Sequence, residues 1–411
     1  MINKKIMLNL IIITAFTASL SMTACKAEYS TKQNTNNSIT SGTANNIIHK
    51  KNNINSDKPP KETTNKSNHS LIDSQPITPI KLKKGKITYN KTIKSIDATI
   101  SDYKLAGYTG KYIYCGKFER DSEYSYYISE GKENGFSRLK KVYTIKANMI
   151  YPARVYEEGI IANTANDTEK GIITGVYNIN SNSGRCIYES SGMRMSLTCP
   201  INGYLYINND TGEGSVLNKY NIEKNQTDEI MKYKSHIDKD DKITGDTVCE
   251  MYGFGNGLVV EIVKFNKEIA NLDETGKAEI WYYDIDKEEF EKLPIAPKRK
   301  ALYVGGDRDC IITSDYAFEE PLEDTGTIYL LKDNKYYEIK IPEIASANDI
   351  IEAHRLSPSV IAIMTSGAKL YLIDLKNYNY EVLDYEDICF GKDSFCMADK
   401  ESKLCICSDF N

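Results

Sequence analysis

The stretch Ile280-Trp281-Tyr282-Tyr283-Asp284-Ile285 has counterparts along the whole second part of this 411-residue chain. Each counterpart is a short, mostly apolar run with a polar residue at or next to its end, and several contain tyrosine. β-Branched and aromatic side chains favour strands. A recurring pattern of this kind indicates a fold built from repeated units. The counterparts are Tyr126–Ser129, Val176–Ile179, Lys219–Ile222, Leu330–Lys332, Ile373–Leu375 and Ile406–Ser408.

A second apolar strand precedes each of these runs, and several of these strands begin after a turn pair such as Asn202-Gly203 or Asn256-Gly257. Asn and Gly tolerate the positive φ that a tight reversal needs. Another apolar run follows the polar residue, as Phe290 and Leu293 do after Asp284. Each unit is therefore expected to hold four short antiparallel strands in about 45 residues, the size of a β-propeller blade.

The ends of the chain make the prediction more specific. The seventh unit stops at Asn411, directly after its third strand. An uncovered strand edge invites aggregation, so another segment must supply the fourth strand. The β-rich segment Lys86–Ile93 precedes the first unit and is the expected donor. We predict an all-β fold, a β-propeller of seven blades closed by its N-terminal strand pairing with the C-terminal blade. Six or eight blades are the alternatives.

The tyrosine-rich repeat resembles the family of bacterial lipoproteins that carry a divergent TolB-like β-propeller. The resemblance covers most of residues 86–411 and rests on Ile280–Ile285 and its copies. The Trp-Asp ending and Gly-His start of WD40 repeats are not found, and the single Trp cannot repeat around a quinone cofactor. We expect no haem, no quinone and no other cofactor.

The N-terminus carries the features of an export signal. Lys4 and Lys5 precede an apolar stretch from Ile6 to Leu20, and Met22-Thr23-Ala24-Cys25 resembles a lipoprotein cleavage box. We predict that residues 1–24 are a signal peptide and that Cys25 becomes a lipidated N-terminus at the outer face of the cell membrane. An uncleaved membrane helix and a plain secretory signal are the alternatives, and Met22 departs from the Leu that the family prefers.

Residues 25–85 are rich in Asn, Ser, Thr and Lys and lack strand or helix periodicity, so we expect a disordered tether. The folded domain is expected at 86–411. Residues 26–85 hold 10 Lys against 4 acidic residues, whereas the chain from Lys86 onward holds 40 basic and 53 acidic residues. An acidic domain argues against a nucleic-acid partner, because phosphates need clustered Lys and Arg.

Cysteine and histidine usage bears on metal and disulfide sites. Nine cysteines follow Cys25, and an odd number cannot all pair. Cys405 and Cys407 lie two apart in an expected strand, so both should point to one face and pack in the core. His236 and His354 lie in unrelated segments, which argues against a histidine-based zinc site, and we predict no metal.

The turns between the second and third strands of the units should all open on one face of the ring. They contain 16 acidic and 6 basic residues, which predicts a negative face. The two longest turns belong to neighbouring blades and carry aromatic residues, which suit a binding surface. The predicted ligand-binding residues are Phe265, Tyr316, Phe318, Glu319 and Glu320. The alternative is that these acids only solvate turns and the aromatics pack back onto their blades.

No catalytic constellation is found in the sequence. The run Gly253–Gly257 is better explained as a turn than as a nucleotide loop, and we predict no catalytic residues. We expect a lipid-anchored, extracytoplasmic β-propeller that acts as a non-enzymatic binding or scaffolding module, with the membrane and an unknown protein, peptide or glycan as partners. The alternatives are an exported, for example glycan-directed, hydrolase with carboxylates in the central channel, and a structural protein of the spore or envelope.

Overall fold

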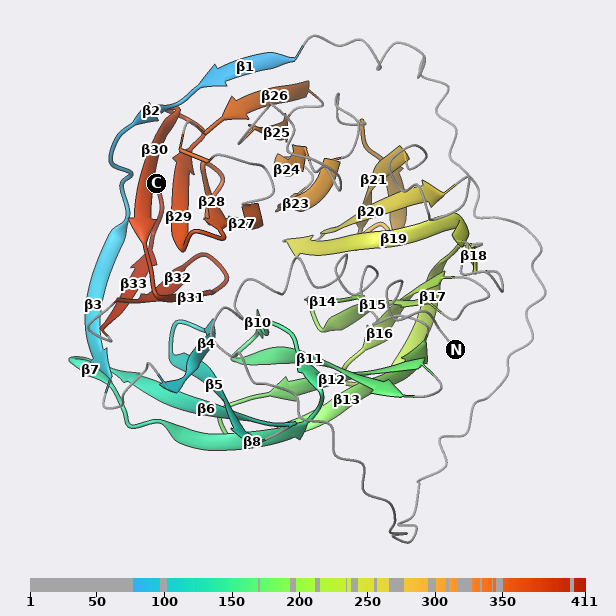
Figure 1. The fold of residues 1–411 in the computed structure, drawn as a ribbon, viewed down its shortest axis with the longest axis horizontal. Coiled ribbons are helices and arrows are strands. Elements are labelled where there is room, and N and C mark those ends of the chain that lie inside the picture. Colours follow the sequence, from blue (N-terminus) through green and yellow to red (C-terminus); the bar gives the residue numbers. More distant parts are fainter. Residues whose placement is uncertain are drawn as a thin grey trace, which may run out of the picture.

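The strands of the domain form a ring of antiparallel sheets around a central axis (Figure 1). Grouped by their hydrogen-bond ladders, the described strands make seven four-stranded units, which we call blades 1 to 7, and the fold is a β-propeller. The computed structural model describes residues 77–96, 102–120, 122–168, 171–192, 197–210, 215–233, 235–237, 243–254, 257–265, 277–294, 301–307, 310–315, 327–332, 335–341, 343–344, 350–399 and 403–411.

The four strands of each blade follow one another in the chain, except in blade 7. Blade 1 holds β4 (Lys104–Tyr108), β5 (Tyr112–Arg120), β6 (Glu123–Lys132) and β8 (Lys140–Lys146); blade 2 holds β10 (Arg154–Tyr156), β11 (Gly159–Thr168), β12 (Gly171–Ile179) and β13 (Gly184–Gly192); blade 3 holds β14 (Leu197–Ile201), β15 (Tyr204–Asp210), β16 (Ser215–Asn221) and β17 (Gln226–Tyr233); blade 4 holds β19 (Ile243–Phe254), β20 (Gly257–Phe265), β21 (Lys277–Asp284) and β22 (Glu289–Lys292).

The remaining blades follow the same order. Blade 5 holds β23 (Ala301–Asp307), β24 (Cys310–Asp315), β25 (Thr327–Lys332) and β26 (Lys335–Lys340); blade 6 holds β27 (Ile350–Arg355), β28 (Val360–Thr365), β29 (Lys369–Asp374) and β30 (Asn379–Asp384); blade 7 holds β31 (Asp387–Phe390), β32 (Phe395–Ala398), β33 (Leu404–Ser408) and β3 (Asn90–Ile96). Short additional strands are β1 (Thr78–Lys81), β2 (Lys83–Lys84), β7 (Gly135–Phe136), β9 (Met149–Ile150) and β18 (Ser235–Ile237).

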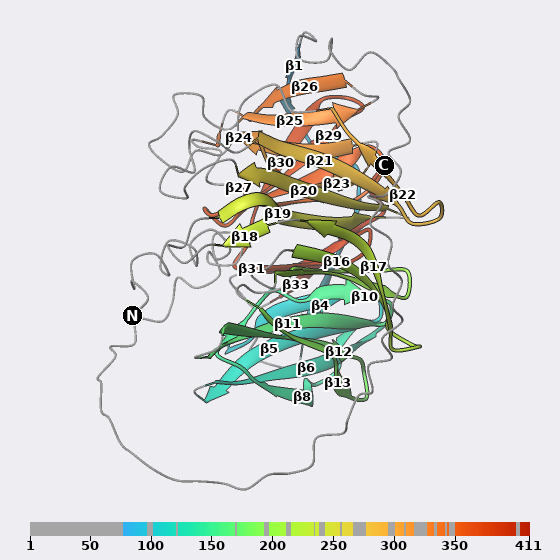
Figure 2. The same cartoon turned by 90° about the vertical axis from the view of Figure 1, so that its right-hand side faces the viewer.

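The first strand of each blade lies near the axis. These strands contact one another around the centre: β4 contacts β10 and β31, β14 contacts β10 and β19, and β23 contacts β19 and β27. From the side, β25, β21, β20 and β16 of blades 5, 4 and 3 are stacked above one another (Figure 2). The first strands therefore surround the centre of the ring.

The predicted closure of the ring is confirmed. Strand β3 pairs antiparallel with β33, from Asn90 opposite Ser408 to Lys94 opposite Leu404, and so supplies the fourth strand of blade 7. The end of β3 also pairs with β7, which links blade 7 to blade 1. The third strands of the seven units carry the polar residues of the sequence repeat, and the second strands carry the apolar runs that precede them.

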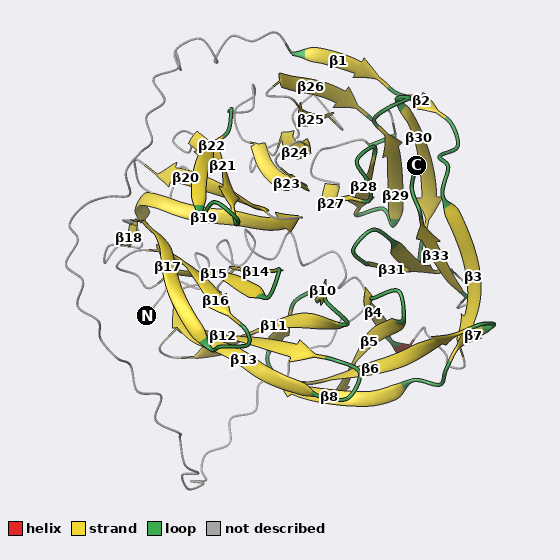
Figure 3. Ribbon diagram, turned by 180° about the vertical axis from the view of Figure 1, so that it is seen from behind, coloured by secondary structure: helices red, strands yellow, loops and turns green. Residues whose placement is uncertain are grey.

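The segment before β3 also joins the ring, which moves the start of the folded part into the stretch predicted as a tether. Strand β1 pairs in parallel with β26 of blade 5, and β2 pairs in parallel with β30 of blade 6. The chain from Thr78 to Ile96, which we call the strap, thus runs along the outside of blades 5, 6 and 7 (Figure 3). Residues 78–81 and 83–84 of the stretch expected as a tether are therefore paired strands, and residues 25–76 lie outside the described part.

Buried strap side chains hold this segment against the ring. Leu82 packs between blades 5 and 6, and Ile87 packs between blades 6 and 7, each with 7% of its surface exposed. The backbone N–H of Ile87 donates to the carboxylate of Glu381 at 3.0 Å. The ring of Tyr89 stacks on Phe410, with centroids 5.3 Å apart. The strap is therefore a packed part of the domain.

The core is divided among the seams between blades. Seven buried clusters occur in the described residues, one at each contact between neighbouring blades. Successive strand side chains point to opposite faces, so Leu330 joins the cluster toward blade 6 while Leu331 joins the cluster toward blade 4. This two-sided burial explains why the strands read as continuous apolar runs. Cys405 and Cys407, as predicted, lie on one face in the core between blades 6 and 7.

The polar residue of the repeat closes a turn. Asn221, Asp284 and Asp374 each accept hydrogen bonds from the backbone N–H groups two and three residues later. The residue four positions after each of them, Asn225, Glu288 or Tyr378, has a positive φ of 54°, 54° and 56°, respectively. In blade 2 this role belongs to Asn180, two residues after the expected Asn178. In blades 2, 3, 4 and 6 an Asx turn thus joins the third and fourth strands.

Among the described residues, no helix has the length and apolar character needed to cross a membrane.

Candidate functional site

Four polar side chains from three blades meet at the axis, and we call them the axis cluster: Arg154, Tyr252, Glu352 and His354. Glu352 and His354 lie two apart on β27, so the pleat directs both to one face. The Nε2 atom of His354 lies 3.0 Å from Oε1 of Glu352. A register shift between Ile350 and Glu352 directly precedes this pair, and such bulges change the direction of nearby side chains.

The imidazole of His354 is fixed by partners from other blades. Its Nδ1 atom lies 3.4 Å from the hydroxyl of Tyr252 on β19. Its ring stacks on Phe390 of β31, with centroids 3.6 Å apart and planes 17° apart. The imidazole therefore links a carboxylate to a phenol across the centre of the ring.

Arg154 on β10 supplies a positive charge to the same cluster. Its guanidinium carbon lies 5.7 Å from the ring centroid of Tyr252, within the range of a cation–π contact. Its Nη1 atom lies 3.7 Å from the sulfur of Cys199 on β14. Burial raises the pKa of the Cys199 thiol, although the nearby guanidinium opposes this effect. Cys199 is therefore held as a thiol and not as a nucleophilic thiolate.

The electrostatics of the axis cluster favour an ionised Glu352. Burial acts to raise the pKa of this carboxyl, but the charge and hydrogen bond of His354 and the charge of Arg154 together outweigh burial and lower it to about 2. The Glu352 side chain nevertheless keeps 33% of its surface exposed. The axis thus presents a water-accessible carboxylate next to a guanidinium, which suits polar or charged ligands.

Asp387 is a second carboxylate on a first strand, β31, whose side-chain contacts the structure describes. It accepts hydrogen bonds from the backbone N–H of Leu105 at 2.6 Å and of Ile388 at 3.0 Å. Burial raises its pKa, and these hydrogen bonds oppose the rise. Since Leu105 belongs to β4, Asp387 joins blade 7 to blade 1 and has a structural role.

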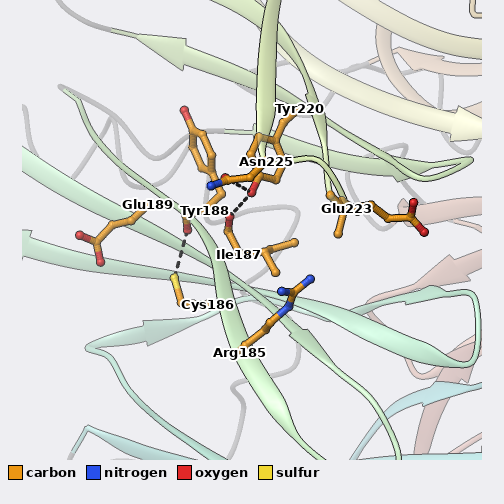
Figure 4. Close-up of a pocket in the computed structure, with 9 residues that line it drawn as sticks. Arg185, Cys186, Ile187, Tyr188, Glu189, Tyr220, Glu223 and Asn225 are labelled. Atoms are coloured by element: carbon orange, nitrogen blue, oxygen red, sulfur yellow. Dashed lines mark hydrogen bonds between the residues drawn. The ribbon is translucent and has the colours of Figure 1, made fainter. Parts of the chain in front are cut away.

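A second candidate lies on the rim, in the seam between blades 2 and 3 (Figure 4), and we call it the rim pocket. It has a volume of about 340 Å³. The hydroxyl of Tyr220 lies 2.8 Å from the carbonyl of Ile187 and 2.7 Å from Oδ1 of Asn225, so its single proton can go to either. The rim pocket is lined by Arg185, Cys186, Ile187, Tyr188, Glu189, Tyr220, Ile222, Glu223 and Asn225.

The walls of the rim pocket are aromatic and its edges are charged. The rings of Tyr188 and Tyr220 meet edge to face, with centroids 5.6 Å apart. The Tyr188 hydroxyl accepts a hydrogen bond from Nδ2 of Asn209 at 2.6 Å. Glu189 and Glu223 extend to opposite sides of the group in Figure 4. Because burial raises the pKa of the Cys186 thiol, this cysteine is not activated as a nucleophile.

The residues predicted for ligand binding are not tested by the structure. Phe265 ends β20, where its backbone pairs opposite Gly245, but its side chain lies outside the described part. Tyr316, Phe318, Glu319, Glu320 and the predicted lipidation site Cys25 lie outside the described residues. The ends of β20 and β24, from which the two turns depart, occupy equivalent positions in blades 4 and 5.

The axis cluster was missed by the sequence reasoning. The alternation Glu352-x-His354 in a strand was the available signal, but it does not say which strand faces the axis. Among the described residues, no group of three or more His, Cys, Asp and Glu side chains could hold a metal ion. The axis cluster is thus a set of ion pairs and hydrogen bonds in the described structure.

No protein-family model and no curated protein matches the chain. The WD40 β-propeller domain of Doa1 is 9% identical, with 78% of this chain and 96% of that chain covered and a TM-score of 0.46. The β-propeller domain of the Trilobed protease from Pyrococcus furiosus is 14% identical, with coverage of 75% and 96% and a TM-score of 0.45. Apo AztD from Citrobacter koseri is 11% identical, with coverage of 70% and 89% and a TM-score of 0.40. The propeller assignment therefore rests on the ladders of the chain itself.

Proposed function

We propose that this chain is a lipid-anchored, extracytoplasmic β-propeller that binds a partner at the cell envelope. The pairing of the strap with the ring supports this proposal. The N-terminal stretch enters the ring at Thr78 and then pairs in turn with β26, β30 and β33 of three blades. A pull from an anchored N-terminus is thereby shared among three ladders and the buried side chains Leu82 and Ile87.

The anchor itself depends on Cys25. Replacing Cys25 by Ala is expected to abolish lipidation, because the thiol is the group that accepts the diacylglycerol in a lipoprotein signal. Metabolic labelling with a palmitate analogue should mark the wild-type chain and leave the variant unmarked, and the variant should leave the membrane fraction. Equal labelling of both forms would contradict lipidation at Cys25.

The proposed partner surface is the negative face formed by the turns between second and third strands. Phe265, Tyr316, Phe318, Glu319 and Glu320 are the residues we assign to it, since the aromatics and acids of two neighbouring turns suit a basic protein, a peptide or a glycan. The Tyr316→Ala, Phe318→Ala double variant is expected to lose its partner in a pull-down from cross-linked cells without a change in melting temperature. If the double variant retains the partner, the partner binds at another surface.

A second candidate function, an exported hydrolase, has the contact between Glu352 and His354 in its favour. Glycoside hydrolysis usually needs two carboxylates about 5 to 9.5 Å apart. Glu352 is paired with His354, and Asp387 is held by backbone N–H groups. Asp246, Glu250 and Asp307 also lie on first strands, but their side chains are outside the described part. The described side chains thus offer no pair of carboxylates for this chemistry. We therefore retain binding as the proposed function.

A further inference from the structure

The rim pocket has an equivalent elsewhere in the ring. It lies between the outer strand of blade 2 and the turn after the third strand of blade 3. The seam between blades 5 and 6 holds a pocket in the same position, formed by Leu330, Lys332, Tyr337, Leu375 and Tyr378 together with Ile80. The two turns match residue by residue, since Asn221 and Asp374 cap them, and Ile222 and Leu375 are the buried residues that follow.

In the seam between blades 5 and 6, the strap occupies this position. Ile80 of β1 lines the seam, and only about 70 Å³ of space remains there. Leu82 is buried in the adjoining cluster. The N–H groups of Lys83 and Gly85 donate to the carbonyls of Tyr378 and Tyr380, each at 2.9 Å. The chain thus shows how a seam of this ring takes up an extended peptide.

The equivalent seam between blades 2 and 3 is open. Its pocket of about 340 Å³ is lined by apolar and aromatic groups, including Ile187, Tyr188 and Ile222, and no residue of the strap is among them. The outer strand β13 offers Gly184–Cys186 as an edge before a bulge at Ile187 interrupts the register. The bulge limits the length of a strand that could be added to β13. A two-residue ladder is enough in the strap, where β2 pairs with β30 over only two residues. A peptide could therefore bind through a short ladder and one apolar side chain in the pocket.

Charge indicates which peptide fits. The strap segment Pro79-Ile80-Lys81-Leu82-Lys83-Lys84 alternates aliphatic and basic residues, and Lys84 pairs with Glu343 at 2.7 Å. The chain from Lys86 onward has 53 acidic and 40 basic residues. At the rim pocket, Glu189 and Glu223 outnumber Arg185. A basic, aliphatic segment complements this site.

We propose that the rim pocket is a docking site for an extended segment of a partner polypeptide in which aliphatic residues alternate with lysines. The segment would lie along Gly184–Cys186 and insert an aliphatic side chain between Tyr188, Tyr220 and Ile222. This inference goes beyond the proposed function, because neither the lipid anchor nor the surface around Phe265 and Phe318 takes part. Recognition of an extended segment at a sheet edge combines backbone hydrogen bonds with side-chain pockets.

The test uses a labelled synthetic peptide with the strap sequence of residues 77–85, ITPIKLKKG, added to the full chain. The strap already covers the seam between blades 5 and 6, and the protein variants below assign the binding to the open seam. Fluorescence anisotropy is expected to show saturable, micromolar binding. A peptide with Ile80→Ser and Leu82→Ser, or one with its lysines replaced by Glu, should lose at least tenfold in affinity. Equal binding of the three peptides would overturn the proposal.

Protein variants locate the site without relying on the peptide alone. The double variant Glu189→Lys, Glu223→Lys changes two exposed side chains and should weaken peptide binding about tenfold, as expected for charges at the rim of an interface. The matched control Glu229→Lys changes an exposed residue of β17 outside the pocket and should bind like the wild type. Equal affinities of the double variant and the control would exclude this site.

The other occupants are distinguished by cross-linking. A photoreactive benzoylphenylalanine at position 189 of the full chain should capture the labelled peptide. Capture of a second copy of the chain, or of residues from its own first 76 positions, in place of the peptide would overturn the assignment to a partner polypeptide.

Discussion

Replacing Ile87 by Asp is expected to lower the free energy of unfolding by about 4 kcal/mol, because it removes a buried aliphatic group and introduces an unpaired charge. Ile87 is 7% exposed and packs with Val360, Leu372 and Phe410 between blades 6 and 7. The new carboxylate would also lie next to Glu381, which accepts the N–H of residue 87. Urea unfolding followed by tyrosine fluorescence measures the change as a lower midpoint.

The control for this experiment lies in the same strap. Ile93 on β3 has 62% of its surface exposed, so Ile93→Asp changes the same residue type to the same charge without burying it. Its effect should stay within about 0.5 kcal/mol. If both variants unfold at the same urea concentration, the buried side chain of Ile87 contributes no packing energy, and the ring is held closed by the β3–β33 ladder alone.

The blades could be predicted from the sequence because the units repeat a similar strand pattern. The apolar runs mark the second and third strands, and in blades 3, 4 and 6 the residue that ends the third strand closes an Asx turn. The missing fourth strand of the last unit predicted the closure, since an open edge must be covered. In blade 2 the sequence did not show which residue caps the turn, because Asn178 and Asn180 both fit the pattern. Only the turn geometry selects Asn180.

The strap strands β1 and β2 could not be predicted, because their composition resembles that of the tether. The segment Pro79–Lys84 is short and lysine-rich, and its two aliphatic residues gain burial only from blades that follow some 250 to 300 residues later in the chain. The axis cluster was hidden for a similar reason. Arg154, Tyr252 and His354 come from three blades and meet only when the ring is closed.

The Glu352→Gln variant is expected to reduce the loss of stability that the wild type shows in acid. The pKa of Glu352 in the folded chain is lowered to about 2 from its usual value of 4.5. A lowered carboxyl pKa stabilises the fold above the unfolded pKa, and this contribution disappears as the pH falls from about 4.5 toward 2. The full shift corresponds to about 3 kcal/mol, which we reduce to about 1 to 2 kcal/mol because the side chain is partly solvated. Urea midpoints at pH 5.5 and pH 3.0 measure the difference between wild type and variant.

Asp387 provides a control of opposite sign. Burial raises the pKa of Asp387 in the folded chain, so the folded chain holds this proton more tightly than the unfolded chain does. Its contribution is present below the unfolded pKa and is lost as the pH rises through the folded value. Relative to Asp387→Asn, the wild type should therefore gain stability between pH 5.5 and pH 3.0, whereas relative to Glu352→Gln it should lose stability over the same range. The same sign for both comparisons would contradict the pairing of Glu352 with His354 and Arg154, because only that pairing opposes the effect of burial at the axis.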